Sequence, residues 1–236
     1  MAGTDGAERL QLYGRRRGRR LRVGQKALLE ELLPKLKVAL PAPGERFEVS
    51  SLFGPQIGDV WLEIGFGGGE HLAWQAARHP AIGFIGAEFF LNGVASLLGH
   101  LARGGIGNVR IHPDDARPLL NALPDRSIGR AFLLFPDPWP KARHARRRFV
   151  GPENLAELAR ILKAGAELRI ASDDPGYVSW TLEHVTRSPE FHWLARGPSD
   201  WRVRPDDWPP TRYEEKALKE GRKPAYLRFR RREPGQ

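Results

Sequence analysis

The fold of this chain is decided by the stretch DVWLEIGFGGGE, residues 59–70. Residues 59–64 form a run of strand length, and the glycines after them let the backbone turn tightly and approach a ligand. A helix is expected over residues 70–78, and its first turn offers free backbone N–H groups to the same ligand. The stretch therefore predicts a strand, a ligand-binding loop and a helix in direct succession.

The same alternation of strand-like and helical runs continues through the rest of the chain. Four more strand-like runs cover residues 81–87, 108–112, 128–135 and 166–171. Helical runs are expected at 91–103, 116–120, 152–162 and 177–185, and a helix bent by Pro34 at 25–38. This order predicts an α/β fold, a parallel sheet covered by helices on both faces. Two later runs, 191–195 and 225–230, are candidates to complete the sheet.

Positive charge is concentrated in two segments. The chain carries 38 Lys and Arg against 28 Asp and Glu, a net charge of +10. Six arginines lie in residues 15–22 and five cations in residues 141–148, and without these eleven the rest of the chain is close to neutral. Residues 1–22 are therefore expected to form a basic flexible arm, and residues 23–236 a single domain. Two basic patches on a neutral body indicate a polyanionic partner.

Several classes of protein are excluded by what the sequence lacks. It contains no cysteine, and its seven histidines show no metal-ligand spacing, so no disulfide and no metal site are expected. No apolar stretch approaches the eighteen residues of a membrane span, so a cytoplasmic protein with no membrane association is expected.

The glycine loop carries a carboxylate that narrows the choice of ligand. Its spacing is Glu63-x-Gly65-x-Gly67-x-Gly69, which differs from the Gly-x-Gly-x-x-Gly of dinucleotide-binding loops. The carboxylate of Glu63 would repel a pyrophosphate, but it suits a ligand that carries an ammonium and a sulfonium group. The loop therefore favours S-adenosylmethionine as the cofactor.

Two further acids follow the next two strands. Glu88 lies 25 residues after Glu63, where a carboxylate can accept hydrogen bonds from both ribose hydroxyls. The alternative is a surface acid at a strand end. Asp115 follows the third strand, where it can receive the adenine amino group or cap a helix, two roles that are compatible.

The run FLLFPDPWPK, residues 132–141, ends a strand in three prolines. Because proline cannot continue a central strand, the strand is expected to stop near Phe135, with Asp137 and Trp139 on a stiff loop at its carboxyl end. Ligands of open α/β sheets bind at that edge. Trp139 either stacks on a base or packs against its neighbours, and the cations that follow either bind a polyanion or form a solvated basic face.

At this point the chain resembles the bacterial type of tRNA (guanine-N7)-methyltransferases. The resemblance extends from Arg15 to Arg230 and is strongest in three motifs, which are LEIGFG at 62–67, FPDPW at 135–139 with the basic tail to 148, and TRYE at 211–214. It implies a class I S-adenosylmethionine-dependent methyltransferase of Rossmann-like fold, with a seven-stranded, mostly parallel sheet whose last strand is antiparallel. It also implies methyl transfer to guanine-46 in the tRNA variable loop, with S-adenosylhomocysteine as the product.

The resemblance implies a role for each residue that matches a family motif. The residues implied to bind the cofactor are Glu63, Gly65, Glu88, Asp115 and Asp137, and Asp137 is also the implied catalytic residue. Those implied to bind the substrate are Lys141, Asp173, Thr211, Arg212, Tyr213 and Glu214. Those implied to contact RNA are Arg143, Arg146, Arg147 and Arg148. Both a monomer and a homodimer remain open.

Three of these assignments have competing interpretations. The family's usual Thr-Lys-Phe-Glu is Thr-Arg-Tyr-Glu here, and arginine is not equivalent to lysine. Thr211 and Glu214 also have the spacing of a capping box. Asp173 has the position of a helix N-cap.

Two other functions are weighed against N7 methylation. The Asp137-Pro138-Trp139 motif is similar to the Asp/Asn-Pro-Pro-aromatic loop of enzymes that methylate exocyclic amines, although the second proline is missing. A non-enzymatic RNA-binding protein of the same fold is the other alternative. The complete set of Glu63, Glu88 and Asp137 argues for an enzyme.

Overall fold

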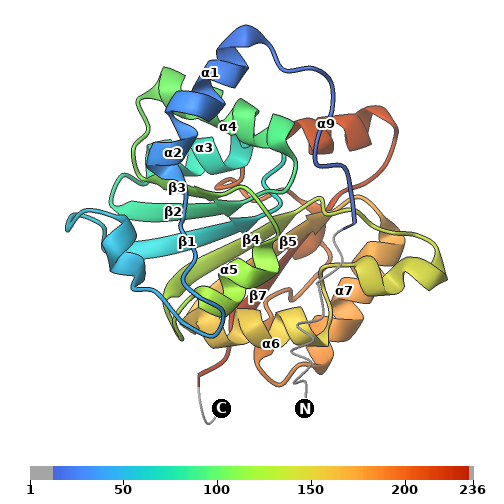
Figure 1. Cartoon of the computed structure of the whole chain (residues 1–236). Helices are drawn as coiled ribbons and strands as arrows, with labels where there is room; N and C mark the ends of the chain where they lie inside the picture. The colour runs from blue at the N-terminus through green and yellow to red at the C-terminus, as the bar shows by residue number, and fades with distance from the viewer. Residues whose placement is uncertain (1–12, 234–236) are drawn as a thin grey trace, which may run out of the picture.

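A computed structural model of the chain describes residues 13–233, and its centre is one seven-stranded sheet (Figure 1). The strands lie in the order β3-β2-β1-β4-β5-β7-β6. Their bounds are β1 Asp59–Ile64, β2 Ile82–Ala87, β3 Val109–His112, β4 Ile128–Leu134, β5 Leu162–Ser172, β6 Phe191–Trp193 and β7 Ala225–Arg231. Strands β1 to β5 are parallel, and β7 pairs antiparallel with both β5 and β6. The predicted seven-stranded sheet with an antiparallel last strand is confirmed.

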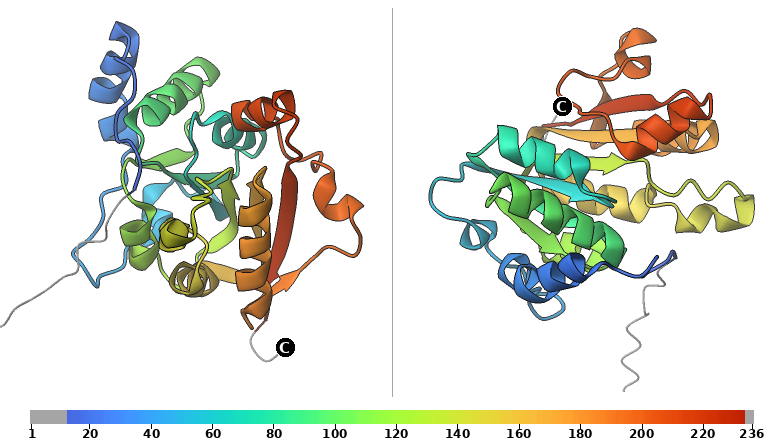
Figure 2. Two further views of the ribbon diagram at one scale, coloured as in Figure 1. Left: turned by 90° about the vertical axis from the view of Figure 1, so that its right-hand side faces the viewer. Right: turned by 90° about the horizontal axis from the view of Figure 1, so that it is seen from above.

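Helices cover both faces of the sheet (Figure 2). The α-helices are α1 Val23–Glu31, α2 Leu33–Leu36, α3 Glu70–Arg78, α4 Leu91–Gly104, α5 Ala116–Ala122, α6 Pro152–Ile161, α7 Pro175–Arg187, α8 Ser199–Arg202 and α9 Arg212–Lys219. Two short 3-10 helices are η1 Val49–Leu52 and η2 Ala142–Arg147. The helix expected at 25–38 is divided at Leu32, because Pro34 lies in the first turn of α2, where its missing N–H costs nothing.

The sheet separates two hydrophobic cores. Val60, Leu62 and Ile64 of β1 face the core that is covered by α5, α6 and α7. Trp61 faces the other core, under α3 and α4. Because side chains alternate along a strand, Glu63 points to the same face as Trp61. The alternation therefore places the Glu63 side chain on the side of the sheet that α3 and α4 cover.

The strand order reverses at the centre of the sheet. From β1 the chain moves outward through β2 and β3, and it then crosses to the other side of β1 to form β4 and β5. In open α/β sheets a ligand binds at such a reversal, beyond the carboxyl ends of the strands. The fold therefore places a binding site where β1 and β4 end.

One strand boundary differs from the expectation. Strand β5 begins at Leu162 instead of residue 166, directly after α6. Its first residues pair with the start of β4 across a register irregularity, and Gly165 has a φ of +77°. The local sequence Lys-Ala-Gly does not have a strand pattern, so this extension is imposed by the neighbouring strand.

The predicted arm, residues 1–22, lies outside the described residues as far as residue 12. Residues 13–22 run past the N-terminus of α4. The Leu91 N–H donates to the Arg16 carbonyl (3.0 Å), and the Asn92 side chain bonds the backbone of Gly18 and Arg19. This segment therefore has its own contacts with the domain.

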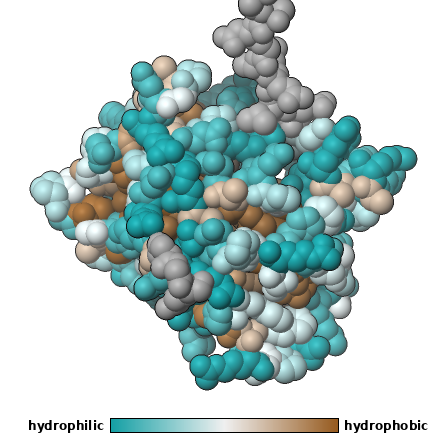
Figure 3. Space-filling view, turned by 90° about the horizontal axis from the view of Figure 1, so that it is seen from below, coloured by the Kyte–Doolittle hydropathy of each residue, from teal (hydrophilic) through white to brown (hydrophobic). Residues whose placement is uncertain are grey.

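The face of the molecule that Figure 3 shows is mostly polar, with some apolar side chains between the polar ones. The large hydrophobic side chains that are exposed among residues 13–233 are Val23, Val203, Tyr213 and Leu218. None of the helices in this range is both long enough and apolar enough to cross a membrane.

Candidate active site at the carboxyl ends of the strands

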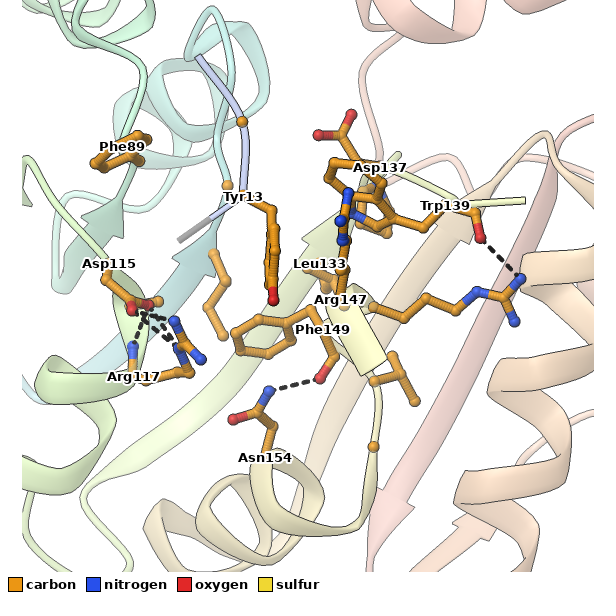
Figure 4. Close-up of a pocket in the computed structure, with 18 of the residues that line it drawn as sticks. Tyr13, Phe89, Asp115, Arg117, Leu133, Asp137, Trp139, Arg147, Phe149 and Asn154 are labelled. Carbon is orange, nitrogen blue, oxygen red and sulfur yellow. Dashed lines mark hydrogen bonds and ion pairs between the residues drawn. The ribbon is translucent and has the colours of Figure 1, made fainter. Parts of the chain in front are cut away.

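A cavity of about 890 Å³ opens at the carboxyl ends of β1, β2 and β4 (Figure 4). This volume lies within the range of small-molecule and cofactor sites. The residues that line it are 13–15, 64, 65, 67, 87–90, 114–117, 133–137, 139 and 145–154, together with Trp180, His184 and Tyr213. The strand ends, the proline-bracketed loop and the basic segment therefore meet at one place, as the sequence predicts.

The glycine loop after β1 has the backbone conformation that its glycines permit. Gly65, Gly67 and Gly69 all have positive φ, in the left-handed region that other residues rarely adopt. A Cβ atom on Gly67 would lie 2.7 Å from the Tyr213 ring, so that ring packs directly on the loop. A Cβ atom on Gly65 would meet no protein atom within 4 Å, and Gly65 lines the cavity. The loop thus leaves room for a ligand at Gly65.

Glu88 lies immediately after β2 and lines the cavity. Its carboxylate accepts hydrogen bonds from the backbone N–H groups of Gly67 (2.7 Å) and Phe90 (2.8 Å). Burial raises the pKa of Glu88 above its ordinary value, although these backbone bonds oppose the shift. The carboxylate therefore joins the glycine loop to the start of α4 and keeps lone pairs that can accept from a ligand.

Glu63 does not line the cavity. Its side chain is buried behind the glycine loop, where Oε2 lies 2.6 Å from His71 Nδ1. His71 and Gln75, which extend this contact along α3, were not predicted as site residues. Their spacing of four residues on the helix after the acid is the signal that could have shown them.

Asp115 has both of the features expected of it. It is the N-cap of α5, accepting from the Arg117 N–H (3.0 Å), and it also lines the cavity. Its carboxylate forms an ion pair with the Arg117 side chain, with a shortest distance of 2.6 Å. Arg117 lines the cavity too and was missed, because an arginine two residues after an N-cap has no distinctive pattern.

Asp137 is exposed and lines the cavity from the proline loop. It lies between Phe135 and Trp139, which have φ values of 51° and 44°. Positive φ is uncommon for such residues, costs on the order of 1–3 kcal/mol and concentrates at functional sites. Arg148 holds the loop by donating to the carbonyls of Pro138 (2.9 Å) and Trp139 (3.2 Å).

Trp139 is half-buried at the rim of the cavity, outside both hydrophobic cores. Its ring makes edge contacts with Tyr13 (6.0 Å between centroids) and His144 (5.9 Å). The Arg147 guanidinium lies 4.3 Å from the Tyr13 ring and 5.0 Å from the Trp139 ring. These contacts show that Trp139 packs against Tyr13 and the basic segment, with part of the ring at the cavity.

The five cations of the basic segment divide into two groups. Arg147 and Arg148 are partly buried and engaged, Arg147 with two aromatic rings and Arg148 with the proline loop and the Trp180 ring. Lys141, Arg143 and Arg146 are exposed. Only this second group is free of contacts that fix the proline loop.

The segment 211–214 also contains both buried residues and residues near the cavity. Thr211 and Glu214 are buried, and the Thr211 hydroxyl accepts from the Glu214 N–H (3.2 Å), so Thr211 caps α9 as one half of the predicted capping box. The Glu214 carboxylate does not complete the box, because it bonds Tyr226 instead. Glu214 also pairs with Arg204 (3.0 Å). Tyr213 lines the cavity, and Arg212 donates to its hydroxyl (3.0 Å).

Asp173 and Lys141 do not line the cavity. Asp173 forms an ion pair with Arg222 at 2.5 Å. The alternative role of Asp173 as an N-cap is wrong, because Asp174 caps α7 by accepting from the Tyr177 N–H (2.7 Å). Two adjacent acids before a helix do not show in sequence which of them takes the cap. Within residues 13–233 no group of three or more His, Asp or Glu side chains has the arrangement to hold a metal ion.

The family match and the fold together place this chain among the methyltransferases. Residues 58–227 match a family described as putative methyltransferase. The fold is similar to that of the 16S rRNA methyltransferase KamB, with a TM-score of 0.54 at 15% identity over 80% of this chain and 98% of that one. An rRNA methylase from Streptococcus thermophilus aligns with a TM-score of 0.52 at 15% identity, over 74% and 87%. The fold is that of the class I S-adenosylmethionine-dependent methyltransferases.

Curated relatives identify the family more narrowly. A tRNA (guanine-N(7)-)-methyltransferase of Rhodospirillum rubrum is 55% identical over 95% of this chain and 89% of the relative. One of Paramagnetospirillum magneticum is 53% identical over 98% of this chain and 96% of the relative. The chain belongs to the family of bacterial-type tRNA (guanine-N7)-methyltransferases.

Proposed function

We propose that this protein transfers a methyl group from S-adenosylmethionine to N7 of guanine-46 in the variable loop of tRNA, in the cytoplasm. The observation that carries the proposal is the single cavity where the glycine loop, Glu88 and Asp137 meet. Relatives of more than 50% identity that carry this activity in their names support it. The guanine position rests on the family resemblance.

The cavity suits S-adenosylmethionine in both size and chemistry. Glu88 offers a carboxylate to the ribose hydroxyls, Asp115 lies at the end of β3 for the adenine, and Gly65 leaves space at the loop. Five acidic residues line the cavity, Glu88, Asp114, Asp115, Asp137 and Glu153. Five arginines line it as well, so the cavity offers carboxylates to a positively charged ligand without being acidic as a whole. When bound, S-adenosylmethionine supplies a methyl group on a sulfonium, which the N7 lone pair attacks without the prior loss of a proton.

The work of the protein is alignment and charge stabilisation. Guanine N7 has an in-plane lone pair, so no residue is needed to create the nucleophile. Fixing two reactants in a productive geometry can lower the barrier by about 7–11 kcal/mol in favourable cases. Asp137, held between two prolines, accepts from the N–H groups of the guanine edge and stabilises positive charge that develops on the purine.

The RNA is bound by the exposed part of the basic segment. Lys141, Arg143 and Arg146 neutralise phosphates, while Arg147 and Arg148 keep the proline loop in shape. The major groove of regular duplex RNA is too deep and narrow to expose N7, so the target base lies in a loop or is splayed out. Tyr213 lines the cavity from α9, beside the glycine loop, and contributes to base binding, and Arg212 holds its hydroxyl.

Methylation of defined tRNA transcripts tests this function. The protein is incubated with labelled S-adenosylmethionine and a transcript that carries either guanine or adenine at position 46, and the product is then reduced and treated with aniline. Label incorporation with strand cleavage at position 46, absent from the adenine transcript, is the expected result. Label that resists cleavage would show transfer to an exocyclic amine, and binding of tRNA without cofactor binding would show a non-enzymatic protein.

A further inference from the structure

A buried chain of three polar side chains lies behind the glycine loop and has no role in the steps above. Glu63 and His71 are each 2% exposed, and Gln75 is 1% exposed. His71 Nδ1 lies 2.6 Å from Glu63 Oε2, and His71 Nε2 lies 3.2 Å from Gln75 Nε2. The edge of the His71 ring also packs on Phe132, 4.7 Å between centroids. Such a chain is costly to bury unless its hydrogen bonds are well matched.

The Gln75 end of this row of hydrogen bonds shows which group donates in each of them. Gln75 Nε2 donates to the backbone carbonyl of Asp207 (2.8 Å), so the nitrogen of the amide, and not its oxygen, faces that carbonyl. The second N–H of the same amide then points to His71 Nε2, which must accept. In a neutral imidazole the other nitrogen carries the proton, so Nδ1–H donates to Glu63.

This direction has a consequence for charge. A neutral His71 leaves the carboxylate of Glu63 hydrogen-bonded but still negative. Among the residues that the structure describes, His71 is the one basic side chain within ion-pair distance of Glu63. A negative charge without a buried counterion is strongly unfavourable unless a ligand or solvent compensates it. Glu63 itself does not line the cavity, but the next two residues, Ile64 and Gly65, do, so this charge lies directly behind the loop that faces the cavity.

We infer that His71 and Gln75 are positioning residues that hold Glu63 as an uncompensated carboxylate for the cationic amino-acid end of the cofactor. This inference rests on the proposed function, because it needs S-adenosylmethionine as the ligand. The Asp207 carbonyl belongs to the segment between α8 and α9. This segment leads into α9, whose Tyr213 ring packs on Gly67 of the glycine loop. The chain therefore also ties the cofactor acid to the segment that packs on Gly67.

Two ligands separate an effect on charge from an effect on shape. S-adenosylhomocysteine carries the charged amino-acid end, and 5′-methylthioadenosine keeps the adenosine and the sulfur but lacks that end. His71→Phe keeps an aromatic ring against Phe132 and removes the donor to Glu63. Calorimetric titration of His71→Phe is expected to show about tenfold weaker binding of S-adenosylhomocysteine, as for loss of one charged hydrogen bond, with binding of 5′-methylthioadenosine within twofold of the wild type.

Further variants make the test specific. His71→Asn places an amide nitrogen close to the position of Nδ1 and is expected to restore most of the lost affinity. Gln75→Met removes the donor to Nε2 and is expected to weaken S-adenosylhomocysteine binding by about threefold. His192→Phe, on an exposed position of β6, is the control for the same substitution elsewhere and is expected to bind both ligands as the wild type does.

Three results would overturn the inference. If His71→Phe lost affinity equally for both ligands, the three side chains would only support the shape of the loop. If both affinities were unchanged, the contact between Glu63 and His71 would be purely structural. If His71→Phe does not fold in thermal melts, wild-type affinity for S-adenosylhomocysteine in Gln75→Met would overturn it instead. A wild-type protein that binds neither ligand refutes the proposed function itself, whereas methyl transfer with unaffected variants refutes this inference alone.

Discussion

On the glycine-loop side the predicted acids Glu63, Glu88 and Asp115 each have a protein partner, whereas Asp137 on the proline-loop side has none among residues 13–233. Glu63 bonds His71, Glu88 accepts from two backbone N–H groups, and Asp115 caps α5 and pairs with Arg117. Within residues 13–233 the structure records no hydrogen bond or ion pair to the Asp137 carboxylate, which is exposed. Figure 4 shows Asp115 and Asp137 on opposite sides of the pocket, with Tyr13 between them.

This difference indicates that the two sides are completed at different times. The cofactor side is held in place by bonds within the protein, so it needs little reorganisation when a ligand binds. The proline-loop side has a fixed backbone, with positive φ at Phe135 and Trp139, but within residues 13–233 no group donates a hydrogen bond to its Asp137 carboxylate. The donor, in the proposed function, is the guanine base.

The largest effect is expected from removing the charge on the proline-loop side. Asp137→Asn should lower kcat by about a hundredfold or more, because a preorganised electrostatic group is lost in the transition state. Affinity for S-adenosylhomocysteine should stay within about twofold, since the cofactor side keeps its bonds. Single-turnover methylation of tRNA and calorimetric titration measure the two quantities.

The control for Asp137→Asn is Asp206→Asn, the same change at an exposed position that does not line the cavity. Thermal melts check that both variants fold. Turnover of Asp137→Asn within fivefold of the wild type would show that the carboxylate is not part of the transition state.

The second effect concerns Glu88, the carboxylate that joins the glycine loop to the start of α4. Glu88→Gln should weaken S-adenosylhomocysteine binding by about tenfold to a hundredfold, because hydrogen bonds to a charged acceptor contribute about 1.5–3 kcal/mol. Glu88→Gln should leave single-turnover kcat at saturating cofactor within a few-fold, which is the reverse of Asp137→Asn. Unchanged affinity would remove Glu88 from the cofactor site.

The same residue gives a pH dependence with a definite sign. Burial raises the pKa of Glu88 above its ordinary value of 4.5, so in the ligand-free protein the carboxyl stays protonated to a higher pH. The protonated form has lost part of its acceptor capacity, so cofactor affinity should fall as the pH decreases through the raised pKa and be constant well above it. Glu88→Gln should abolish this part of the pH profile, and an unchanged profile would contradict the assignment.

A third, smaller effect separates the exposed cations from those engaged in the loop. Arg143→Ala combined with Arg146→Ala should flatten the slope of log affinity for tRNA against log salt by about two units, since each neutralises about one phosphate. The control is Arg78→Ala with Arg103→Ala, exposed positions in the last turns of α3 and α4, at the opposite edge of the sheet. A slope that survives the first pair and not the second would place the RNA elsewhere.

The smallest effect is expected at Thr211. Thr211→Ala removes an N-cap, which costs about 1 kcal/mol and lowers the Tm by about 2–4 °C in a domain of this size. Because its hydroxyl is buried and occupied, kcat/KM for tRNA should remain within twofold. A larger loss of kcat/KM at a temperature far below the Tm would restore Thr211 as a substrate contact.

Short-range patterns in the sequence predicted the frame of the site correctly. Glycines and prolines define the ends of β1 and β4 because they restrict the backbone locally, and Thr211 and Glu214 form a cap because they are three residues apart. The acids Glu88 and Asp115 were placed at the cavity by the strand ends that they follow.

What the sequence did not show depends on contacts between distant segments. Gln75 bonds the backbone of a residue 132 positions away, and the Arg148 guanidinium bonds carbonyls nine and ten positions earlier, which no helix or strand pattern predicts. The spacing of Gln75 after His71 is visible in the sequence, but its partner at Asp207 is not, because that contact is formed only by the tertiary fold. For the same reason the division of the basic segment into exposed and engaged cations appears only in the structure.

The reversal of strand order between β1 and β4 divides the cavity between two parts of the chain. The glycine-loop wall comes from residues 64–117, before the loop 123–127, and the proline-loop wall comes from residues 133–154, after it. A ligand that touches both walls is therefore a cross-link between the two parts, and it opposes their separation by mass action, by about 2.7 kcal/mol at a hundred times its Kd. A chain cut within the loop 123–127 would need that ligand most, since the two fragments would otherwise be joined mainly along β1 and β4.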